Sequence, residues 1–226
     1  MKSPLKLLAV VGAAILSLAA AAPAQNWNTV VARTPWPGHL FGNPAAKVKL
    51  IEYVSYTCPH CSEFQIESEA PLRLNYIRSG KLSLEVRPLL RDPVDATVAL
   101  LAYCGPKDKF PINHSMFLRS QSKWIVPMVT ASPAQRQRWS TGSRLQRARA
   151  IAADFHFYEM MATRGYSRTM IDKCLADEGL ADRMAKGTDA AVNAGVDHTP
   201  TFAIGDQILM GTNDWQLLEA QLAARM

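Results

Sequence analysis

The chain has 226 residues, of which 19% are charged, and its formal net charge is +6. This length allows one domain with a substantial core, or one domain that carries a large insertion. The charge excess is too small to indicate a nucleic-acid-binding protein, and no nucleic-acid motif accompanies the arginine cluster at residues 136–149. We interpret that cluster as a solvated helix face, with a docking patch for a membrane protein or anionic head groups as the alternative.

The first 24 residues have the layout of a cleavable secretory signal peptide. Two lysines precede an almost purely apolar stretch at residues 7–22, and Ala22-Pro23-Ala24 ends it with small residues. We therefore predict that residues 1–24 are removed on export and that the mature chain begins at Gln25. A retained membrane anchor is the alternative, which the shortness of the stretch and its uncharged far flank disfavour.

The first half of the remaining chain predicts a strand–helix–strand unit. Residues 26–42 are rich in Pro, Gly and Trp, and we expect a short strand and a loop there. Apolar side chains on both faces predict a covered central strand at residues 48–54. A helix should begin at Pro59, kink near Pro71 and stop at Gly80. A second strand at residues 82–90 should then lie parallel to the first.

From Val94 the hydrophobic period becomes helical. We predict helices at residues 94–104, 115–124, 143–163 and 167–177, and one that begins at Pro133 with Ser132 as its N-cap. Strands return at residues 201–204 and 208–210, and a closing helix follows from Thr212. The strands before and after the helical block predict one α/β domain, formed by residues 25–93 and 186–226. An all-helical domain is then inserted at residues 94–185.

Four cysteines follow the predicted signal peptide, at positions 58, 61, 104 and 174. In an exported chain this even number indicates two disulfides, or one redox pair and one structural bond. A structural bond between Cys58 and Cys61 would close a very small loop and stabilise the fold little. A zinc site needs about four ligands, of which this pair supplies two. We therefore expect no metal site and favour a redox pair.

The redox interpretation has a physical mechanism. Cys58 stands at a predicted helix N-terminus, where unpaired N–H groups and the helix dipole stabilise a thiolate. Cys61 lies one turn further along, where it can resolve a mixed disulfide. His60 adds a donor and, when protonated, a positive charge beside Cys58. Because a stabilised thiolate favours the reduced form, the pair should donate its disulfide readily.

The sequence Cys58-Pro59-His60-Cys61 resembles the active site of DsbA-like thiol:disulfide oxidoreductases, periplasmic bacterial enzymes of the thioredoxin-fold superfamily. Gly42-Asn43-Pro44 and the strand that leads into the cysteine pair are also similar to this family. The segment at residues 195–202, Gly-Val-Asp-His-Thr-Pro-Thr-Phe, resembles the family's Gly-Val-x-Gly-Thr-Pro-Thr-Phe segment. Residues 99–104, 117–124 and 171–175 are similar to an alphaproteobacterial subgroup, so the resemblance covers most of residues 40–226.

The resemblance implies a thioredoxin fold, a mixed central sheet flanked by helices, and assigns roles to individual residues. Glu52 matches the family's buried acid, which assists proton transfer at Cys61. Pro200 should follow a cis peptide bond and pack opposite the cysteine pair, and Thr199 should offer backbone hydrogen bonds to the substrate. His198 replaces a small residue of the family. It is either an exposed loop residue or one that tunes the thiolate or gates the substrate.

The resemblance also implies a Cys104–Cys174 disulfide, with two free buried thiols as the alternative. The implied function is a periplasmic oxidase that transfers the Cys58–Cys61 disulfide to reduced, unfolded exported proteins through a mixed disulfide at Cys58. A DsbB-like, quinone-linked membrane oxidase would reoxidise it, and we expect a monomer without a cofactor or a nucleic-acid partner. The alternatives are an isomerase or reductase of the same fold, or a binding protein, either a holdase or a metal scavenger.

Overall fold

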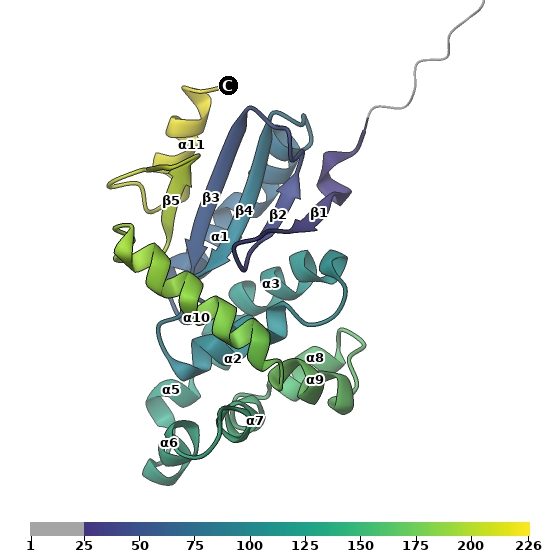
Figure 1. Ribbon diagram of the computed structural model, residues 1–226, viewed down its shortest axis with the longest axis vertical. Coiled ribbons are helices and arrows are strands. Elements are labelled where there is room, and N and C mark those ends of the chain that lie inside the picture. The colour runs from purple at the N-terminus through teal and green to yellow at the C-terminus, as the bar shows by residue number, and fades with distance from the viewer. Residues whose placement is uncertain (1–24) are drawn as a thin grey trace, which may run out of the picture.

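The computed structural model describes residues 25–226, so the predicted signal peptide lies outside the described residues. A six-stranded mixed sheet forms the upper half of the molecule, and most of the helices gather below it (Figure 1). The strand order is β1-β2-β4-β3-β5-β6. The strands are β1 (Val31–Arg33), β2 (His39–Gly42), β3 (Val48–Val54), β4 (Leu82–Pro88), β5 (Thr201–Ile204) and β6 (Gln207–Ile208). The predicted α/β fold with a mixed sheet is confirmed.

The predicted strand–helix–strand unit forms the middle of this sheet. β3 is parallel to β4 and antiparallel to β5. Between β3 and β4, α1 (Pro59–Pro71) continues directly into a π-helix, η2 (Leu72–Ile77), because Pro71 has no N–H to continue the α-helical ladder. Gly80, with a φ of 74°, ends the segment. β4 ends at Pro88, two residues before the expected end, since proline cannot donate a further ladder bond.

The helical block follows β4. Its segments are α2 (Pro93–Ala102), η3 (Lys107–Lys109), α3 (Phe110–Arg119), α4 (Gln121–Trp124), α5 (Pro127–Thr130), α6 (Pro133–Ser140), α7 (Arg144–Asp154), α8 (Phe157–Ala162) and α9 (Arg168–Leu175). The predicted start of the helix at residues 115–124 was wrong, because Pro111 lies at the beginning of α3 and allows the helix to start earlier. The expected helix at residues 143–163 is divided at His156, whose φ of 58° is left-handed.

One long helix was missing from the sequence interpretation. α10 (Glu178–Asn193) begins after Asp177, whose side chain accepts a hydrogen bond from Leu180 N at 2.8 Å. In Figure 1 it runs from the helical block to β5, so the predicted boundary between residues 185 and 186 falls inside it. Gly187 allows this path, because a Cβ there would lie 2.9 Å from Pro37 Cγ.

The two ends of the described chain also differ from expectation. Residues 26–42 form η1 (Trp27–Thr29) and two strands instead of one. The closing helix, α11 (Trp215–Ala223), begins after Asp214 and not at Thr212, because the Asp214 carboxylate accepts a hydrogen bond from Leu217 N at 2.8 Å. Between residues 25 and 226, no helix combines the length and apolar character that a membrane crossing requires.

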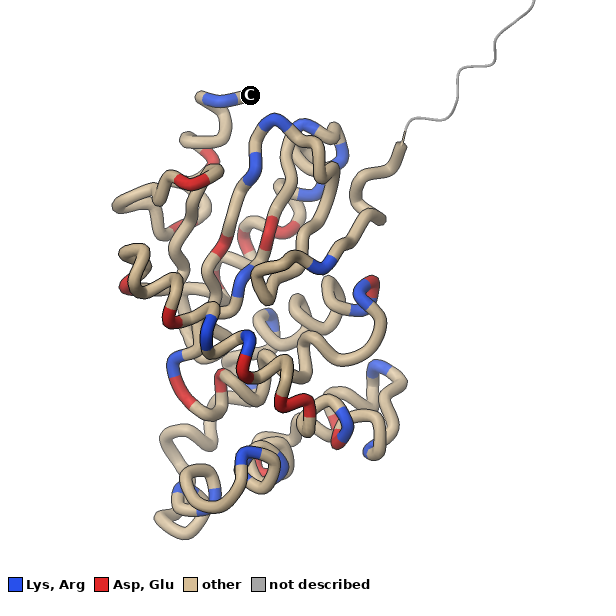
Figure 2. The backbone as a smooth tube through the Cα atoms, viewed as in Figure 1, with Lys and Arg blue, Asp and Glu red and all other residues tan. Residues whose placement is uncertain are grey.

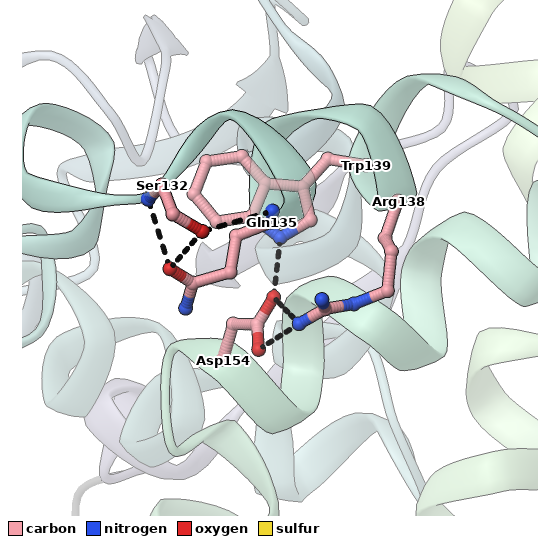
Figure 3. A network of polar contacts seen from close by, with 5 residues as sticks. All are labelled: Ser132, Gln135, Arg138, Trp139 and Asp154. Atoms are coloured by element: carbon pink, nitrogen blue, oxygen red, sulfur yellow. Dashed lines mark hydrogen bonds and ion pairs between the residues drawn. The ribbon is translucent and has the colours of Figure 1, made fainter.

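The arginine cluster lies on α6 and α7, where blue predominates in Figure 2. Figure 3 shows that Arg138 donates to both oxygens of Asp154, at 2.9 and 3.0 Å, and that Trp139 Nε1 donates to the same carboxylate at 2.7 Å. In the same view Ser132 and Gln135 form the capping box that starts α6. These contacts link α6 to α7, and they favour the solvated, ion-paired interpretation of this face.

A disulfide joins Cys104, just after α2, to Cys174 in α9. The two cysteines are 70 positions apart in the sequence. Loop-closure entropy gives such a bond a stabilisation of about 4 kcal/mol, although the origin of this effect is debated.

We expect Cys104 and Cys174 to resist alkylation in the unfolded, unreduced protein, and mild reduction to expose only Cys58 and Cys61. Mass mapping of the labelled peptides checks this. The Cys104→Ser/Cys174→Ser variant should lose about 4 kcal/mol of unfolding free energy in urea. Labelling of all four thiols without reductant would contradict the bond.

Candidate active site

The sheet brings two loops together at one edge. β3 ends at Val54 and leads to Cys58, and the antiparallel neighbour β5 starts directly after Pro200. Since antiparallel neighbours place the end of one strand beside the start of the other, residues 141 positions apart meet. The Thr199–Pro200 peptide bond is cis. The Cys58 thiol donates to the carbonyl oxygen of Thr199 at 3.1 Å.

Cys58 is the N-cap of α1, and its side chain is 3% exposed. The pKa of its thiol is lowered from 9.0 to about 5, chiefly by a hydrogen bond from the Cys61 thiol. Burial opposes this shift, whereas a hydrogen bond from the Thr199 side chain and the backbone N–H groups of Cys61 and His60 add to it. Pro59 occupies the first helical position, where its missing N–H costs no hydrogen bond. The start of this helix is therefore arranged around a thiolate.

The backbone N–H of His60 helps to lower the pKa of Cys58, whereas its ring contacts Glu63. The imidazole Nδ1 lies 3.0 Å from Glu63 Oε2, and the side chain is 71% exposed. The expectation that a protonated ring would place a positive charge beside Cys58 stays a prediction, and in the structure the ring contacts the Glu63 carboxylate. The physical reason is the spacing of three residues on α1, which puts both side chains on one helix face.

Cys61 has the opposite environment from Cys58. It is fully buried, and burial raises the pKa of its thiol well above the usual value. The neighbouring Cys58 and the carboxyl group of Glu52 raise it further. The pair thus consists of a thiolate at the helix end and a protonated thiol behind it.

Glu52 lies in β3 and is 1% exposed. Burial raises the pKa of its carboxyl group from 4.5 to about 8, so it carries a proton at neutral pH. Its Oε1 atom has no hydrogen-bond partner among residues 25–226. A cavity of about 40 Å³ adjoins it and is also lined by Gln65, Ser68 and His114. This volume can hold a water molecule, which would connect the carboxyl group to polar neighbours.

A hydrogen-bonded chain borders this cavity. Tyr56 Oη lies 2.9 Å from His114 Nδ1, and His114 Nε2 lies 3.2 Å from Gln65 Oε1. Burial lowers the pKa of His114 to about 3, so its ring is neutral. An amide oxygen can only accept, so Nε2 carries the hydrogen and Nδ1 accepts from the tyrosine. No local sequence pattern indicates these hydrogen bonds, because the residues that form them come from three separate segments.

Two further residues fix the backbone before Cys58. Asp95 accepts hydrogen bonds from Ser55 Oγ at 2.6 Å and from Tyr56 N at 2.7 Å. Gln121 Nε2 donates to the carbonyl oxygens of Tyr56 and Cys58, at 2.7 and 2.8 Å. Both residues belong to the helical block, which therefore positions the cysteine loop. Sequence reasoning assigned neither role, although Gln121 belongs to a segment that resembles the alphaproteobacterial subgroup.

On the other side of Cys58, Thr199 and Pro200 line a groove of about 420 Å³ together with His60 and His198. His198 is partly exposed, and its Nδ1 lies 2.6 Å from Asp197 Oδ1. The structure therefore places His198 on the same groove as His60, as an exposed loop residue paired with a carboxylate. Within the described residues, no cluster of three or more histidine, cysteine or acidic side chains could hold a metal ion.

A sequence model described as Thioredoxin matches residues 36–224, which is most of the chain. The chain belongs to the thioredoxin family. The crystal structure of a protein-disulfide isomerase from Novosphingobium aromaticivorans is 50% identical over 84% of this chain and 97% of that one, with a TM-score of 0.81. The crystal structure of alpha-DsbA1 from Wolbachia pipientis shares the fold at 20% identity, over 82% of this chain and 88% of that one, with a TM-score of 0.64. The predicted thioredoxin fold and the resemblance to DsbA-like proteins are confirmed.

Curated relatives match a shorter stretch. A protein of Rickettsia bellii, provisionally named a protein-disulfide oxidoreductase, is 32% identical over 88 residues, which are 38% of this chain and 34% of that protein. A Rickettsia felis protein with the same provisional name is 34% identical over 86 residues, 38% of this chain and 31% of that protein. The chain thus spans about a third of the length of these relatives.

Proposed function

We propose that the chain is an exported thiol:disulfide oxidoreductase that donates the Cys58–Cys61 disulfide to reduced proteins in the periplasm. The observation that carries this proposal is the contrast between the two sulfur atoms. The pKa of Cys58 falls to about 5 at the start of α1, whereas burial raises the pKa of Cys61. A pair that is stable as thiolate and thiol gives up its disulfide readily.

The transfer proceeds in two exchanges. A substrate thiolate attacks Cys58 of the disulfide, because Cys58 stands at the start of α1 beside the cis-proline loop, whereas Cys61 has no exposed surface. A mixed disulfide forms, the bond to Cys61 breaks, and Cys61 leaves as a thiolate that takes a proton from Glu52. A second substrate thiolate then attacks the substrate sulfur of the mixed disulfide. The Cys58 thiolate leaves, the substrate holds a disulfide, and the protein holds the two electrons as a thiolate and a thiol.

A further cycle needs an oxidant that accepts those two electrons. We propose a DsbB-like, quinone-linked membrane oxidase for this role, since a groove of about 420 Å³ beside Thr199 and Pro200 offers a partner protein access to this side of the site. We further propose that the protein acts as a monomer on reduced, unfolded exported proteins.

Isomerisation is the second candidate, because the 50% identical Novosphingobium protein is named a protein-disulfide isomerase. An isomerase attacks wrong disulfides with a reduced Cys58, so it must be kept as a dithiol. An oxidase must instead be kept as a disulfide. The reduction potential of the pair therefore separates the two functions.

We expect the protein to equilibrate with a glutathione buffer at a potential above about −180 mV, in the range of strong oxidants. Quenched samples analysed by mass after alkylation measure the reduced fraction. The Cys58→Ala variant should lose all disulfide transfer to a reduced peptide, whereas a holdase would keep its anti-aggregation activity in this variant. A measured potential near the −270 mV of thioredoxin would contradict the oxidase function and indicate a reductase.

A further inference from the structure

Asp197 and His198 form a carboxylate–imidazole pair in the loop before β5. Asp197 Oδ1 and His198 Nδ1 lie 2.6 Å apart. The hydrogen bond from His198 holds the pKa of the Asp197 carboxyl group below its usual value, so this group is ionised at neutral pH. Because a carboxylate can only accept, Nδ1 of the neutral ring carries the hydrogen and Nε2 keeps its lone pair. The ring is thus held in the form that can accept a proton at Nε2.

The backbone places this pair next to the cysteine pair. His198 directly precedes Thr199, whose carbonyl oxygen accepts from the Cys58 thiol at 3.1 Å. The carbonyl oxygen of His198 accepts a hydrogen bond from Thr201 Oγ1 at 2.8 Å, which ties the loop to the start of β5. Consecutive Cα atoms are about 3.8 Å apart. A substrate segment that pairs with the backbone at Thr199 therefore passes beside the imidazole of His198.

The ring is also accessible to such a segment. The His198 side chain is 47% exposed and lines the groove of about 420 Å³ together with Thr199 and Pro200. Among residues 25–226, no side chain forms a hydrogen bond with its Nε2. The groove holds four further titratable groups, those of His60, Glu63, Glu67 and Asp214. Of these, the His60 ring contacts Glu63 along α1, whereas the His198 ring belongs to the loop that contacts Cys58.

We propose that His198 accepts the proton of the incoming substrate thiol and that Asp197 orients its ring. The inference rests on the proposed disulfide transfer at Cys58 and adds a catalytic residue to it. An ordinary cysteine thiol has a pKa of about 8.5, so only a few per cent is ionised at pH 7. Only the thiolate attacks a disulfide. A base where the substrate enters raises the reactive fraction at the place where exchange occurs.

Protons and electrons balance in this step. The proton of the substrate thiol moves to His198 Nε2, and the substrate sulfur keeps the electron pair of its S–H bond. This pair forms the new bond to the Cys58 sulfur. The electron pair of the Cys58–Cys61 bond leaves on Cys61, which takes a proton from Glu52. The imidazolium then releases its proton to water, so His198 can accept the proton of the second substrate thiol.

The pH dependence of the rate tests the inference. Stopped-flow measurement gives the rate constant for oxidation of a reduced dithiol peptide between pH 6 and pH 10, for the wild type and for His198→Asn. Asparagine can still donate to Asp197 but cannot accept a proton. We expect the wild type to be about tenfold faster at pH 6 to 7, less than buried bases achieve because this ring is partly exposed. The ratio should fall towards one near pH 10, where the substrate thiol ionises without a base.

A ratio of two rates separates proton transfer from a structural defect. A distorted loop would slow the variant by the same factor at every pH, and the titration of groups common to both proteins cancels. Asp197→Asn should lose part of the advantage at pH 7, because an amide can bond either form of the ring. His198→Lys keeps a positive charge but has no free base at pH 7, so it should be as slow as His198→Asn.

His156→Asn is the matched control on the far side of the molecule. His156 is an exposed histidine whose Nδ1 lies 3.9 Å from Glu159 Oε2, and asparagine tolerates its φ of 58°. This variant should follow the wild type at every pH.

Three results would overturn the inference and leave disulfide transfer intact. The first is a ratio for His198→Asn that is one throughout or does not change with pH. The second is a wild-type rate in His198→Lys at pH 7, which would assign the effect to charge alone. The third is a pH-dependent loss in His60→Asn that is absent from His198→Asn. Failure of the wild type to oxidise the peptide at any pH would instead overturn the proposed function.

Discussion

Thiolate absorbance of the reduced protein is expected to form with a midpoint near pH 5, where an ordinary cysteine would give 9.0. The reason is the hydrogen bond from the Cys61 thiol, supported by the Thr199 side chain and by the N–H groups of Cys61 and His60. Absorbance of the dithiol form at about 240 nm, read against the oxidised protein, measures it. Cys58→Ser should remove the transition, and a midpoint near 8.5 would exclude a strong oxidant.

Two substitutions of Cys61 separate the causes of the low Cys58 pKa. In Cys61→Ser a hydroxyl still donates to Cys58, so the low midpoint should be largely retained. In Cys61→Ala the principal donor is lost, and the pKa of Cys58 should rise by about one to two pH units. Equal midpoints in these two variants would assign the low pKa to the helix start alone.

The same pKa links redox state to stability. The Cys58 pKa is lower in the folded than in the unfolded protein, so the thiolate contribution is fully present above about pH 9 and is lost as the pH falls through about 5. Between these values the slope approaches about 1.4 kcal/mol per pH unit. The oxidised protein has no such thiolate. The Tm of the reduced protein should therefore fall relative to that of the oxidised protein as the pH falls from 9 to 5.

Replacement of Glu52 by glutamine should slow disulfide transfer about a hundredfold, because glutamine cannot give a proton to the leaving Cys61 thiolate. With the Glu52 pKa at about 8, most of the wild-type molecules hold that proton at neutral pH. Stopped-flow measurement of the reaction with a reduced dithiol peptide checks the rate. Glu69→Gln is the matched control, since Glu69 lines the same cavity but is hydrogen-bonded to Ser115 Oγ at 2.8 Å.

The Glu52→Gln variant should also be more stable than the wild type in alkaline solution. The Glu52 pKa is raised in the folded state, so the wild-type contribution is fully present below about pH 4.5 and is lost as the pH rises through about 8. Glutamine has no such loss. Urea unfolding at several pH values should show the difference growing by about 1.4 kcal/mol per pH unit over this range. An unchanged rate together with an unchanged pH dependence would remove Glu52 from the mechanism.

Local sequence signals predicted much of the fold. The apolar run of β3, the proline after Cys58 and the glycine at position 80 determine where this strand and helix begin and end. Local sequence signals were weaker for elements whose position depends on tertiary packing. α10 carries only a cap and a thin apolar stripe, and its path over Pro37 depends on Gly187, which sequence alone does not reveal.

The sequence by itself determined the chemistry of the protein: a Cys-Pro-His-Cys pair at a helix start, an acid on a covered strand and a Thr-Pro segment at a strand start. These depend on short-range backbone physics, since a helix N-terminus favours a thiolate wherever it occurs. Only the tertiary structure decided which side chains contact the residues of the cysteine pair and its loop. It directed the His60 ring to Glu63 and brought Gln121 to the Cys58 carbonyl from a distant helix. Such contacts depend on side-chain directions and chain crossings, which no local pattern encodes.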